Sequence, residues 1–188
     1  MVQYYLDIET TGLNPLEEQI ITIQYQELDK NTGEAIGELK ILKAWESSEK
    51  EILEKFISDS KILDPYRFSF VPIGFNLNFE HNFLKVRAEK NGLPQIDVLN
   101  HPFLDLQIIG VMMNKGEFKG ASLDKLTGKE KNGSQVPLWH TNKEFNKIIE
   151  YIRMEAREFI RFNAWLYKKL PSLLPQFREE NGLNGKKT

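Results

Sequence analysis

Two carboxylates separated by one residue, Asp7 and Glu9, follow an apolar and aromatic run at the N-terminus. In an extended backbone, side chains at positions i and i+2 point to the same face, so these two acids are expected to converge on one point. Converging carboxylates repel each other unless a cation lies between them, and a divalent metal ion commonly fills that role. The alternative is a strand that ends in a polar turn, because Thr10, Thr11 and Gly12 are ordinary turn residues.

Two further acidic positions could contribute to the same site. Glu80 falls where an apolar segment gives way to a helical pattern, and ligands of open α/β sheets gather at such junctions. A carboxylate at that position can also simply complement the dipole of the helix. Farther along the chain, Tyr151 and Glu155 are four residues apart and therefore share one helix face. Both could reach a bound water, although a surface pair is the alternative interpretation and Glu158 could take the place of Glu155.

The composition limits the kind of metal site. The 188 residues contain no cysteine and three histidines, so oxygen ligands are favoured, and carboxylate sites suit Mg²⁺ or Mn²⁺. The formal net charge of −2 does not mark a nucleic-acid-binding protein, but a nuclease that binds cations does not need a basic surface. No apolar run reaches membrane-spanning length and the N-terminus lacks a basic region, so the sequence indicates a cytoplasmic protein without a membrane partner.

The elements that must position these residues alternate along the chain. We expect strands over residues 2–6, 19–28, 36–45, 68–74 and 103–106. We expect helices from a cap at Ser47 or Ser48, and over residues 78–91, 107–114, 122–126 and about 141–170, with a polar loop over 129–136. Strands first, and then helices alternating with strands, indicate one mixed sheet with helices packed on it. We place a single domain at residues 1–175 and a flexible polar tail at 176–188.

These segments together resemble a known family. Residues 7–12 (Asp-Ile-Glu-Thr-Thr-Gly), residues 76–80 (Asn-Leu-Asn-Phe-Glu) and the pair Tyr151-x-x-x-Glu155 resemble the three motifs of the DEDD family, the DnaQ-like 3′–5′ exonucleases. Residues 120–128 also resemble the segment between the second and third motifs. The resemblance covers about residues 2–170. It implies an α/β, ribonuclease H-like fold with a five-stranded mixed sheet, strand 2 antiparallel, flanked by helices.

The third motif, Tyr151-x-x-x-Glu155, indicates which branch of the family the chain resembles. One branch carries a histidine five residues before the last acid, but five residues after His140 stands Phe145. Tyr151 fits the other branch, DEDDy, which includes the proofreading domains of family B DNA polymerases. The chain departs from that pattern because Glu80 and Glu155 stand where the family has aspartate. Each arm is longer by one methylene, about 1.5 Å, which favours manganese over the geometrically strict magnesium.

The resemblance also implies roles for individual residues. Two divalent ions, Mg²⁺ or Mn²⁺, would be held by Asp7, Glu9, Glu80 and Glu155. Tyr151 would orient the attacking water. The residues implied to contact the substrate are Thr10, Thr11, Gly12, Leu13, Asn76 and Phe79, of which Asn76 could instead shape a turn. Asp105, which ends the last expected strand, would support a ligand from behind.

The implied function is hydrolysis of phosphodiester bonds at the 3′ end of a nucleic acid. Single-stranded DNA is favoured over RNA as the substrate, and the products would be nucleoside 5′-monophosphates. The alternative is a catalytically weak or inactive module that keeps the fold and binds nucleic acid, or that serves as a scaffold for a polymerase or repair partner.

Overall fold

The computed structural model describes residues 1–128 and 133–183. Its five strands form one mixed sheet in the order β3-β2-β1-β4-β5. The strands are β1 (Gln3–Thr10), β2 (Ile20–Leu28), β3 (Ala35–Lys43), β4 (Val71–Gly74) and β5 (Leu104–Asp105). Strand β2 is antiparallel to β1 and β3, whereas β4 is parallel to β1 and β5. The expected five-stranded mixed sheet with an antiparallel second strand is therefore confirmed.

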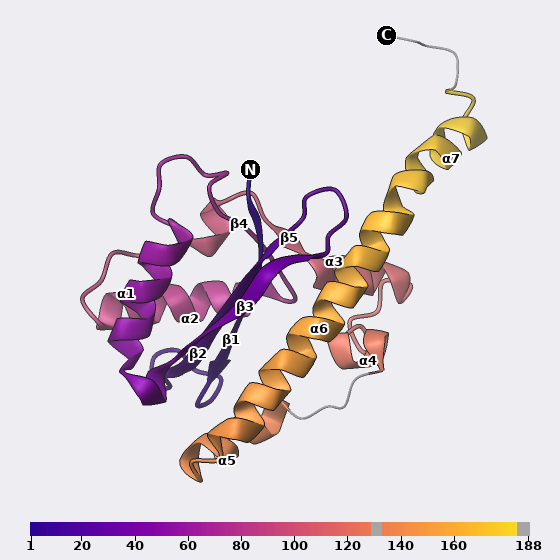
Figure 1. Cartoon of the computed structure of the whole chain (residues 1–188). Helices are drawn as coiled ribbons and strands as arrows, with labels where there is room; N and C mark the ends of the chain where they lie inside the picture. Colours follow the sequence, from indigo (N-terminus) through magenta and orange to yellow (C-terminus); the bar gives the residue numbers. More distant parts are fainter. Residues whose placement is uncertain (129–132, 184–188) are drawn as a thin grey trace.

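Helices cover both faces of this sheet. They are α1 (Glu49–Ser60), α2 (Leu77–Lys90), α3 (Leu106–Met113), α4 (Leu123–Thr127), α5 (Val136–Thr141), α6 (Phe145–Lys169) and α7 (Leu173–Glu180). Helices α1 and α2 lie on one side of the sheet, and the long helix α6 crosses the other side (Figure 1). In the part of the chain that the structure describes, no helix combines the length and the apolar character needed to cross a bilayer.

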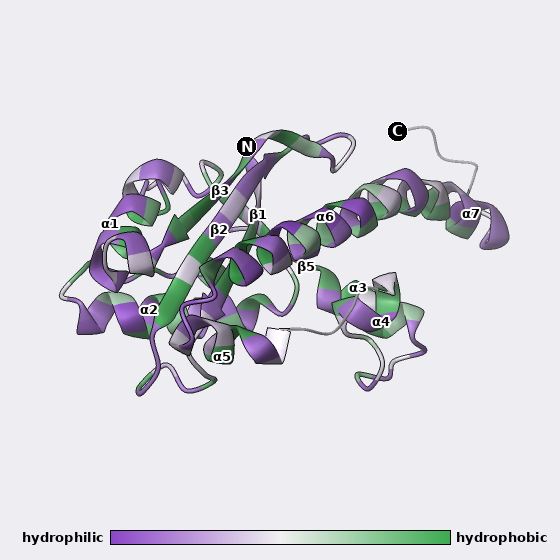
Figure 2. Cartoon of the chain, turned by 60° about the horizontal axis from the view of Figure 1, so that its bottom comes forward, coloured by the Kyte–Doolittle hydropathy of each residue, from purple (hydrophilic) through white to green (hydrophobic). Residues whose placement is uncertain are grey.

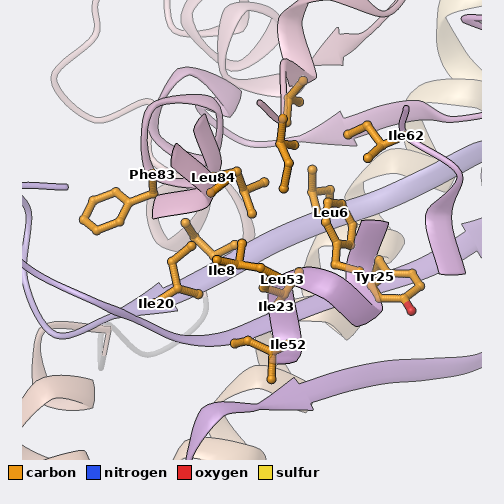
Figure 3. Packing of buried hydrophobic residues seen from close by; sticks show 14 of the residues in the cluster. Leu6, Ile8, Ile20, Ile23, Tyr25, Ile52, Leu53, Ile62, Phe83 and Leu84 are labelled. Atoms are coloured by element: carbon orange, nitrogen blue, oxygen red, sulfur yellow. The ribbon is translucent and has the colours of Figure 1, made fainter. Parts of the chain in front are cut away.

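One face of β1 belongs to the larger part of the hydrophobic core. Leu6 and Ile8 point towards α1 and α2, where they pack in a cluster with Leu53 and Phe83 (Figure 3). Leu53 and Phe83 are fully buried, and Leu6 and Ile8 are nearly so. Since side chains alternate along a strand, the residues between them must face the opposite side of the sheet.

That opposite face of β1 carries Tyr5, Asp7 and Glu9 and looks towards α6. The ring of Tyr5 packs against Phe159 of α6, with 4.7 Å between the ring centroids. The face therefore begins as hydrophobic core at Tyr5 and becomes acidic within two residues. The apolar part fixes α6 against the sheet, and the acidic part lies where α6 can add its own polar side chains.

Strand β1 is longer than the sequence pattern indicated. The expected end at Leu6 is wrong, because the strand runs four residues further and includes both acids. Pairing with β2 explains the difference: Asp7 lies opposite Gln24, and Glu9 lies opposite Thr22. The two carboxylates are therefore held on a paired strand and not on a turn.

The other strand boundaries agree with the expected ones to within three residues. Ser48 caps α1, as expected, because its hydroxyl accepts a hydrogen bond from the backbone N–H of Glu51. The long helix expected from about residue 141 to 170 is present as α6, which begins at Phe145, and a further short helix that was not expected, α5, precedes it and ends at Thr141. Lys143 has a φ of +59°, a left-handed conformation that ends one helix before the next begins. The stretch 129–132 of the expected polar loop lies outside the described residues.

The C-terminal segment also differs from the expected tail. Its first residues, 176–180, are helical and belong to α7, which is exposed along its whole length. Gly182 has a φ of +64° and its N–H donates to the carbonyl of Glu179, while the N–H of Leu183 donates to Arg178. This is the Schellman arrangement that ends a helix in an ordered way. Residues 184–188 lie outside the described part of the chain.

Candidate active site

Asp7 is held in place by two donors from the sheet. The hydroxyl of Tyr5 and the side-chain amide of Gln24 both donate to its Oδ2, at 3.1 and 2.8 Å. Gln24 is itself fixed, because the hydroxyl of Thr22 donates to its Oε1 at 2.9 Å. Gln24 and Thr22 are fully buried. Both donors bind the same carboxylate oxygen of Asp7, Oδ2, and neither of them binds Oδ1.

Three carboxylates converge beside this anchored acid. One oxygen each from Asp7, Glu9 and Glu155 lies within 4.8 Å of the others. The first two come from β1 and the third comes from α6. Oxygens that bind one cation at about 2.0–2.6 Å cannot lie more than about twice that distance apart, so this group lies close to the spacing of a ligand set. The expected convergence of the two acids of β1 with the acid of the third motif is thus present.

The electrostatics of Asp7 fit a bound cation. Burial and, after it, the negative charge of Glu155 raise the pKa of Asp7 to about 7. The hydrogen bonds from Gln24 and Tyr5 oppose this shift. Burial and a neighbouring negative charge disfavour the ionised form of this carboxylate, and a positive charge placed between the two acids would stabilise it.

Glu80 reaches the same place from the first turn of α2. It is 3% exposed, and its Oε2 has no hydrogen-bond partner among the described residues. Burial raises its pKa well above the usual value, and the charge of Asp7 adds to the shift. Glu80 is therefore electrostatically coupled to Asp7 but lies outside the group of three. A buried carboxylate oxygen without a donor is costly unless a proton or a cation satisfies it, so this residue fits a second cation next to Asp7.

Asp105 fixes the strand-to-helix junction that carries Glu80. Its carboxylate accepts hydrogen bonds from the backbone N–H groups of Asn76 at 2.9 Å, Leu77 at 3.0 Å and Gln107 at 3.0 Å. Asn76 has a φ of +69°, the left-handed conformation that asparagine tolerates better than most residues. Asp105 thus ties the ends of β4 and β5 to the start of α2. Whether it also supports a metal ligand stays a prediction.

Tyr151 lies over the acidic group from α6. Burial raises its pKa far above the usual value for a phenol, and the charge of Glu155 adds to this effect. The phenol therefore stays protonated, and it is hydrogen-bonded to Glu155. Gly133 approaches it closely, because a Cβ at that position would lie 2.7 Å from the Tyr151 hydroxyl oxygen. A glycine is thus needed where this segment passes the phenol.

An open cleft of about 290 Å³ lies in front of these groups. Asp7, Tyr151 and Glu155 form one part of its lining. Its other polar lining residues are Asn76, Gln107, Ser122, Asp124 and Ser134. Asp124 belongs to the segment 120–128 and adds another acid to a cleft that is already rich in carboxylates.

Several of the residues expected to contact a substrate have local partners. The hydroxyl of Thr10 donates to the carbonyl of Gly12 at 2.5 Å, and the hydroxyl of Thr11 donates to Glu18 at 2.5 Å. Leu13 is 85% exposed, so its side chain is accessible to a ligand. Phe79 packs against Phe83 and the main core, with 4.8 Å between the ring centroids. Of the residues expected to contact the substrate, Asn76 lines the cleft that the described part of the chain forms.

Glu158, the alternative to Glu155, is directed elsewhere. Its carboxylate pairs with Arg161 at 2.5 Å, one turn further along α6. It does not belong to the group of converging acids in the described residues. The spacing of Tyr151 and Glu155 therefore identifies the acid that reaches the site.

Three residues at the site were not identified from the sequence: Tyr5, Gln24 and Gly133. Tyr5 could have been found, because it precedes Asp7 by two residues and so shares its face. Gln24 gives a weaker signal as a polar residue within the apolar run of β2. The role of Gly133 depends on the path of a loop, for which the sequence gives no signal.

The chain has relatives among known proteins. Residues 4–167 match the model of the RNase_H superfamily. A stretch of 90 residues, 47% of this chain, is 32% identical to an uncharacterized protein of Methanocaldococcus jannaschii and covers 42% of that protein.

Solved structures of exonuclease I from E. coli have a similar fold. The zinc-bound complex with single-stranded DNA gives a TM-score of 0.61 at 13% identity over 93% of this chain. The structure described as suggesting how processivity is achieved gives 0.60 at 13% identity over 93% of this chain. This chain spans 42% of the length of each of these structures and of the archaeal relative. On the strength of the match over residues 4–167, the chain belongs to the RNase_H superfamily.

Proposed function

We propose that this chain is a metal-dependent 3′–5′ exonuclease of the DEDDy type that removes nucleoside 5′-monophosphates from single-stranded DNA. The observation that carries the proposal is the group of Asp7, Glu9 and Glu155, whose oxygens lie within 4.8 Å of one another beside the buried Glu80. Membership of the RNase_H superfamily supports a nuclease. The fold is also that of E. coli exonuclease I, which has been solved with single-stranded DNA, and this supports the choice of substrate.

The carboxylates would hold the cations. Asp7, Glu9 and Glu155 would ligate one divalent ion, and Asp7 with Glu80 would ligate a second. When bound, such ions polarise the scissile phosphate and lower the pKa of the attacking water. Gln24 and Tyr5 would keep Asp7 in one orientation, so that the shared ligand does not have to rearrange during the reaction.

Tyr151 would act as a neutral hydrogen-bond donor. Its raised pKa keeps the proton on the phenol throughout the physiological range, so it would orient the attacking water and would not accept a proton from it. The hydrogen bond to Glu155 places this donor next to a proposed metal ligand. Water orientation and metal binding would therefore be coupled on one helix.

The substrate would approach past the loop that follows β1. Leu13, which is 85% exposed, and Phe79 would contact the terminal base by apolar packing that does not depend on base identity. Asn76 lines the cleft and would donate to the nucleic acid. Because the hydroxyls of Thr10 and Thr11 and the N–H of Thr11 are engaged locally, we assign the polar contact of residues 10–12 to the backbone N–H of Gly12.

The test is digestion of a single-stranded DNA labelled at its 5′ end, with Mn²⁺ and then Mg²⁺. A 3′–5′ exonuclease gives a ladder of shortened labelled strands and nucleoside 5′-monophosphates that chromatography identifies. The same strand made of RNA tests the sugar preference. Folded protein that produces no mononucleotide with either metal would refute the proposal.

Two variants test whether the nuclease activity belongs to this chain or to a contaminating nuclease. Asp7→Asn keeps the side-chain shape but removes the shared ligand, and we expect activity to fall at least about a hundredfold. Glu158→Gln is the matched control, because Glu158 lies on the same helix as Glu155 but pairs with Arg161. We expect this control to keep the wild-type rate.

A non-catalytic nucleic-acid-binding module is the second candidate. The observation in its favour is the pair of lengthened acids, Glu80 and Glu155, which stand where the DEDD pattern has aspartate. This candidate predicts that a single strand binds equally well to the wild type and to Asp7→Asn, with no turnover by either. Turnover by the wild type that is lost in Asp7→Asn would reject it.

A further inference from the structure

A second hollow, which we call the α4–α6 groove, lies along α6 outside the cleft. Helices α3 and α4 lie together beside α6 in both views of the chain (Figures 1 and 2). The groove has a volume of about 330 Å³, which is at the lower end of the range for small-ligand sites, about 300–1,000 Å³. It therefore fits one flat ring and its substituents, and not a folded domain. Its lining residues are Met113, Leu126, Thr127, Arg161, Phe162 and Trp165.

The groove contains an exposed aromatic ring with a fixed orientation. Trp165 is 42% exposed, and its indole packs nearly parallel to the ring of Phe162, with 6.2 Å between the centroids and 12° between the planes. Phe162 belongs to the core between α6 and the sheet, so it anchors the indole from below. An accessible flat ring of this kind is a platform on which a nucleobase can stack.

The charge at the groove is positive. Among the described residues that line it, Arg161 is charged and there is no carboxylate. Its Nη2 forms an ion pair with Glu158 at 2.5 Å and donates to the carbonyl of Thr127 at 3.1 Å, while 64% of the side chain stays exposed. Arg157 shares Glu158 with Arg161, so one acid faces two cations. A guanidinium has five N–H donors, and one that is held through Nη2 can present the others to a phosphate.

The same side of α6 stays basic beyond the groove. Arg161, Trp165 and Lys169 follow one another at intervals of four residues and so form one row along the helix. Residues 159–177 contain Arg161, Lys168 and Lys169 and no acid, in a chain whose formal net charge is −2. The row combines cations with an exposed ring, which is the pattern by which proteins bind a single strand without reading its sequence.

The groove and the cleft share two walls. Residues 122–124 at the start of α4 line the cleft, whereas residues 126–127 at its end line the groove. On α6, Glu155 lines the cleft, and Trp165 lines the groove ten residues later, which is about 15 Å along the helix. A chain molecule bound in the cleft can therefore continue along α6 into the groove.

The groove lies on the far side of the acidic group from the loop that follows β1. The first half of α6 packs with Ile21 at the start of β2, next to that loop. The second half packs with Leu28 at the end of β2. A strand whose 3′-terminal base contacts the loop would thus reach the groove with nucleotides on its 5′ side.

We propose that the α4–α6 groove is a subsite for a nucleotide upstream of the 3′ end of a single strand. This inference rests on the proposed function, because it takes the acidic group as the position of the 3′ end. A base stacks on Trp165, and Arg161 and Lys169 bind the phosphates that flank it. The subsite favours strands that extend beyond the cleft and does not affect substrates that are too short to leave it.

Binding of a labelled oligothymidine of about twelve nucleotides tests the stacking contact. Fluorescence anisotropy in EDTA measures binding without metal-dependent cleavage, and circular dichroism checks that each variant is folded. Trp165→Leu keeps an apolar side chain but removes the flat ring, and we expect it to weaken binding about tenfold. Trp165→Phe keeps a flat ring and should retain most of the affinity. If the groove instead receives an apolar segment of a protein, both variants bind the strand as the wild type does, and that result would overturn the proposal.

The salt dependence of binding tests the phosphate contact. Each phosphate contact to a single strand contributes about 0.7 to the slope of log affinity against log salt concentration. Arg161→Gln should lower the magnitude of the slope by about this amount, whereas Trp165→Leu should leave the slope unchanged. Arg153→Gln is the matched control, because it removes the same charge from an exposed position of α6 outside the groove. An equal slope in the wild type and in Arg161→Gln would contradict the proposal.

Turnover distinguishes failure of the subsite from failure of the nuclease. With Mn²⁺, Trp165→Leu should cleave a thymidine dinucleotide at the wild-type rate and should show about tenfold lower kcat/KM on the longer strand. Wild-type cleavage of both substrates would exclude the subsite and leave the nuclease activity intact. A wild type that binds the strand through Trp165 but cleaves neither substrate would refute the nuclease and leave the subsite standing.

Discussion

Gln24 donates a 2.8 Å hydrogen bond to Oδ2 of Asp7 across the β1–β2 pair. The amide is fully buried and is itself fixed by Thr22, so the acid is oriented by the sheet before any ligand arrives. An anchored ligand loses less conformational freedom on binding a cation than a mobile one does. The sheet therefore contributes to metal binding through a residue that would not itself touch the metal.

Replacing this amide should weaken metal binding. Gln24→Met keeps the volume but removes the donor, and we expect the affinity for Mn²⁺ to fall by about 10- to 100-fold. Isothermal titration calorimetry measures the change directly. Gln26→Met is the matched control, because the Gln26 amide donates to the carbonyl of Gly37 and not to an acid. An unchanged Mn²⁺ affinity in Gln24→Met would show that Asp7 is oriented without this bond.

The stability of the metal-free protein should fall as the pH rises from about 4 to about 7. Burial holds the pKa of Asp7 at about 7, whereas the unfolded chain gives an aspartate a pKa of about 4. Between these values the folded state keeps a proton that the unfolded state has released. The unfolded state then binds fewer protons, so the free energy of unfolding decreases with rising pH. Glu80 is shifted in the same direction.

This pH effect can be isolated with Asp7→Asn, which cannot titrate at that position. Urea denaturation in EDTA gives the free energy of unfolding of both proteins. The value for the wild type minus the value for the variant should fall as the pH rises from about 4 to about 7. Saturating Mn²⁺ should stabilise the wild type more than the variant at neutral pH, because the cation replaces the proton. A difference that stays constant with pH would mean that folding does not raise the pKa of Asp7.

Shortening the acid on α6 should impair the site. The Glu155 oxygen must reach across from α6 to lie within 4.8 Å of the acids on β1. Glu155→Asp withdraws it by about 1.5 Å, so we expect Mn²⁺ affinity and nuclease activity to fall at least about tenfold. Glu158→Asp makes the same chemical change one turn away and should leave both unchanged. Higher activity in Glu155→Asp would indicate that aspartate fits this site better.

The buried ion pair between Glu49 and Arg87 should be a large contributor to stability. Both side chains are about nine-tenths buried, and the guanidinium donates to the two carboxylate oxygens at 2.9 and 2.7 Å. Glu49 also accepts the backbone N–H of Ile20 at the start of β2. Glu49→Ala leaves a buried charge without its partner, so we expect a loss of about 3–5 kcal/mol.

Urea denaturation measures this loss. The exposed pair of Lys50 and Glu54, at 3.9 Å, is the control, and Glu54→Ala should cost less than about 1 kcal/mol. Replacing both buried partners, as in Glu49→Leu with Arg87→Met, should cost less than Glu49→Ala alone, because no uncompensated charge remains. A double variant less stable than the single one would show that the pair itself is strongly favourable.

Much of the architecture could be predicted because local signals agree with the tertiary structure. The apolar run of β2 marks a buried strand, and the cap at Ser48 marks the start of α1. Convergence of Asp7 with Glu9 follows from the period of a strand, and selection of Glu155 follows from its spacing to Tyr151. In these cases the information lies within a few neighbouring residues.

What could not be predicted depends on contacts between distant segments. Residues 7–10 have the composition of a turn and are a strand because β2 pairs with them. The role of Gln24 depends on its position opposite Asp7 in that pairing, and no local pattern around Gln24 indicates which residue of β1 it faces. The hydroxyl of Thr11 was expected to contact the substrate, but it meets Glu18 because the loop folds back on itself. Helix α7 was missed because its polar C-terminal residues resemble those of an irregular tail.

The alternation of β1 also bears on how the chain finds its native alignment. If β1 slid past β2 by one position, Asp7 and Glu9 would enter the dry layer under α1 and α2, and Leu6 and Ile8 would be turned towards the water-filled cleft. Burying two unpaired charges costs far more than any hydrogen bond that the slipped ladder could retain. The acids thus exclude the neighbouring alignments while the sheet assembles. A one-residue insertion ahead of Asp7 would therefore prevent folding, in addition to displacing the ligands.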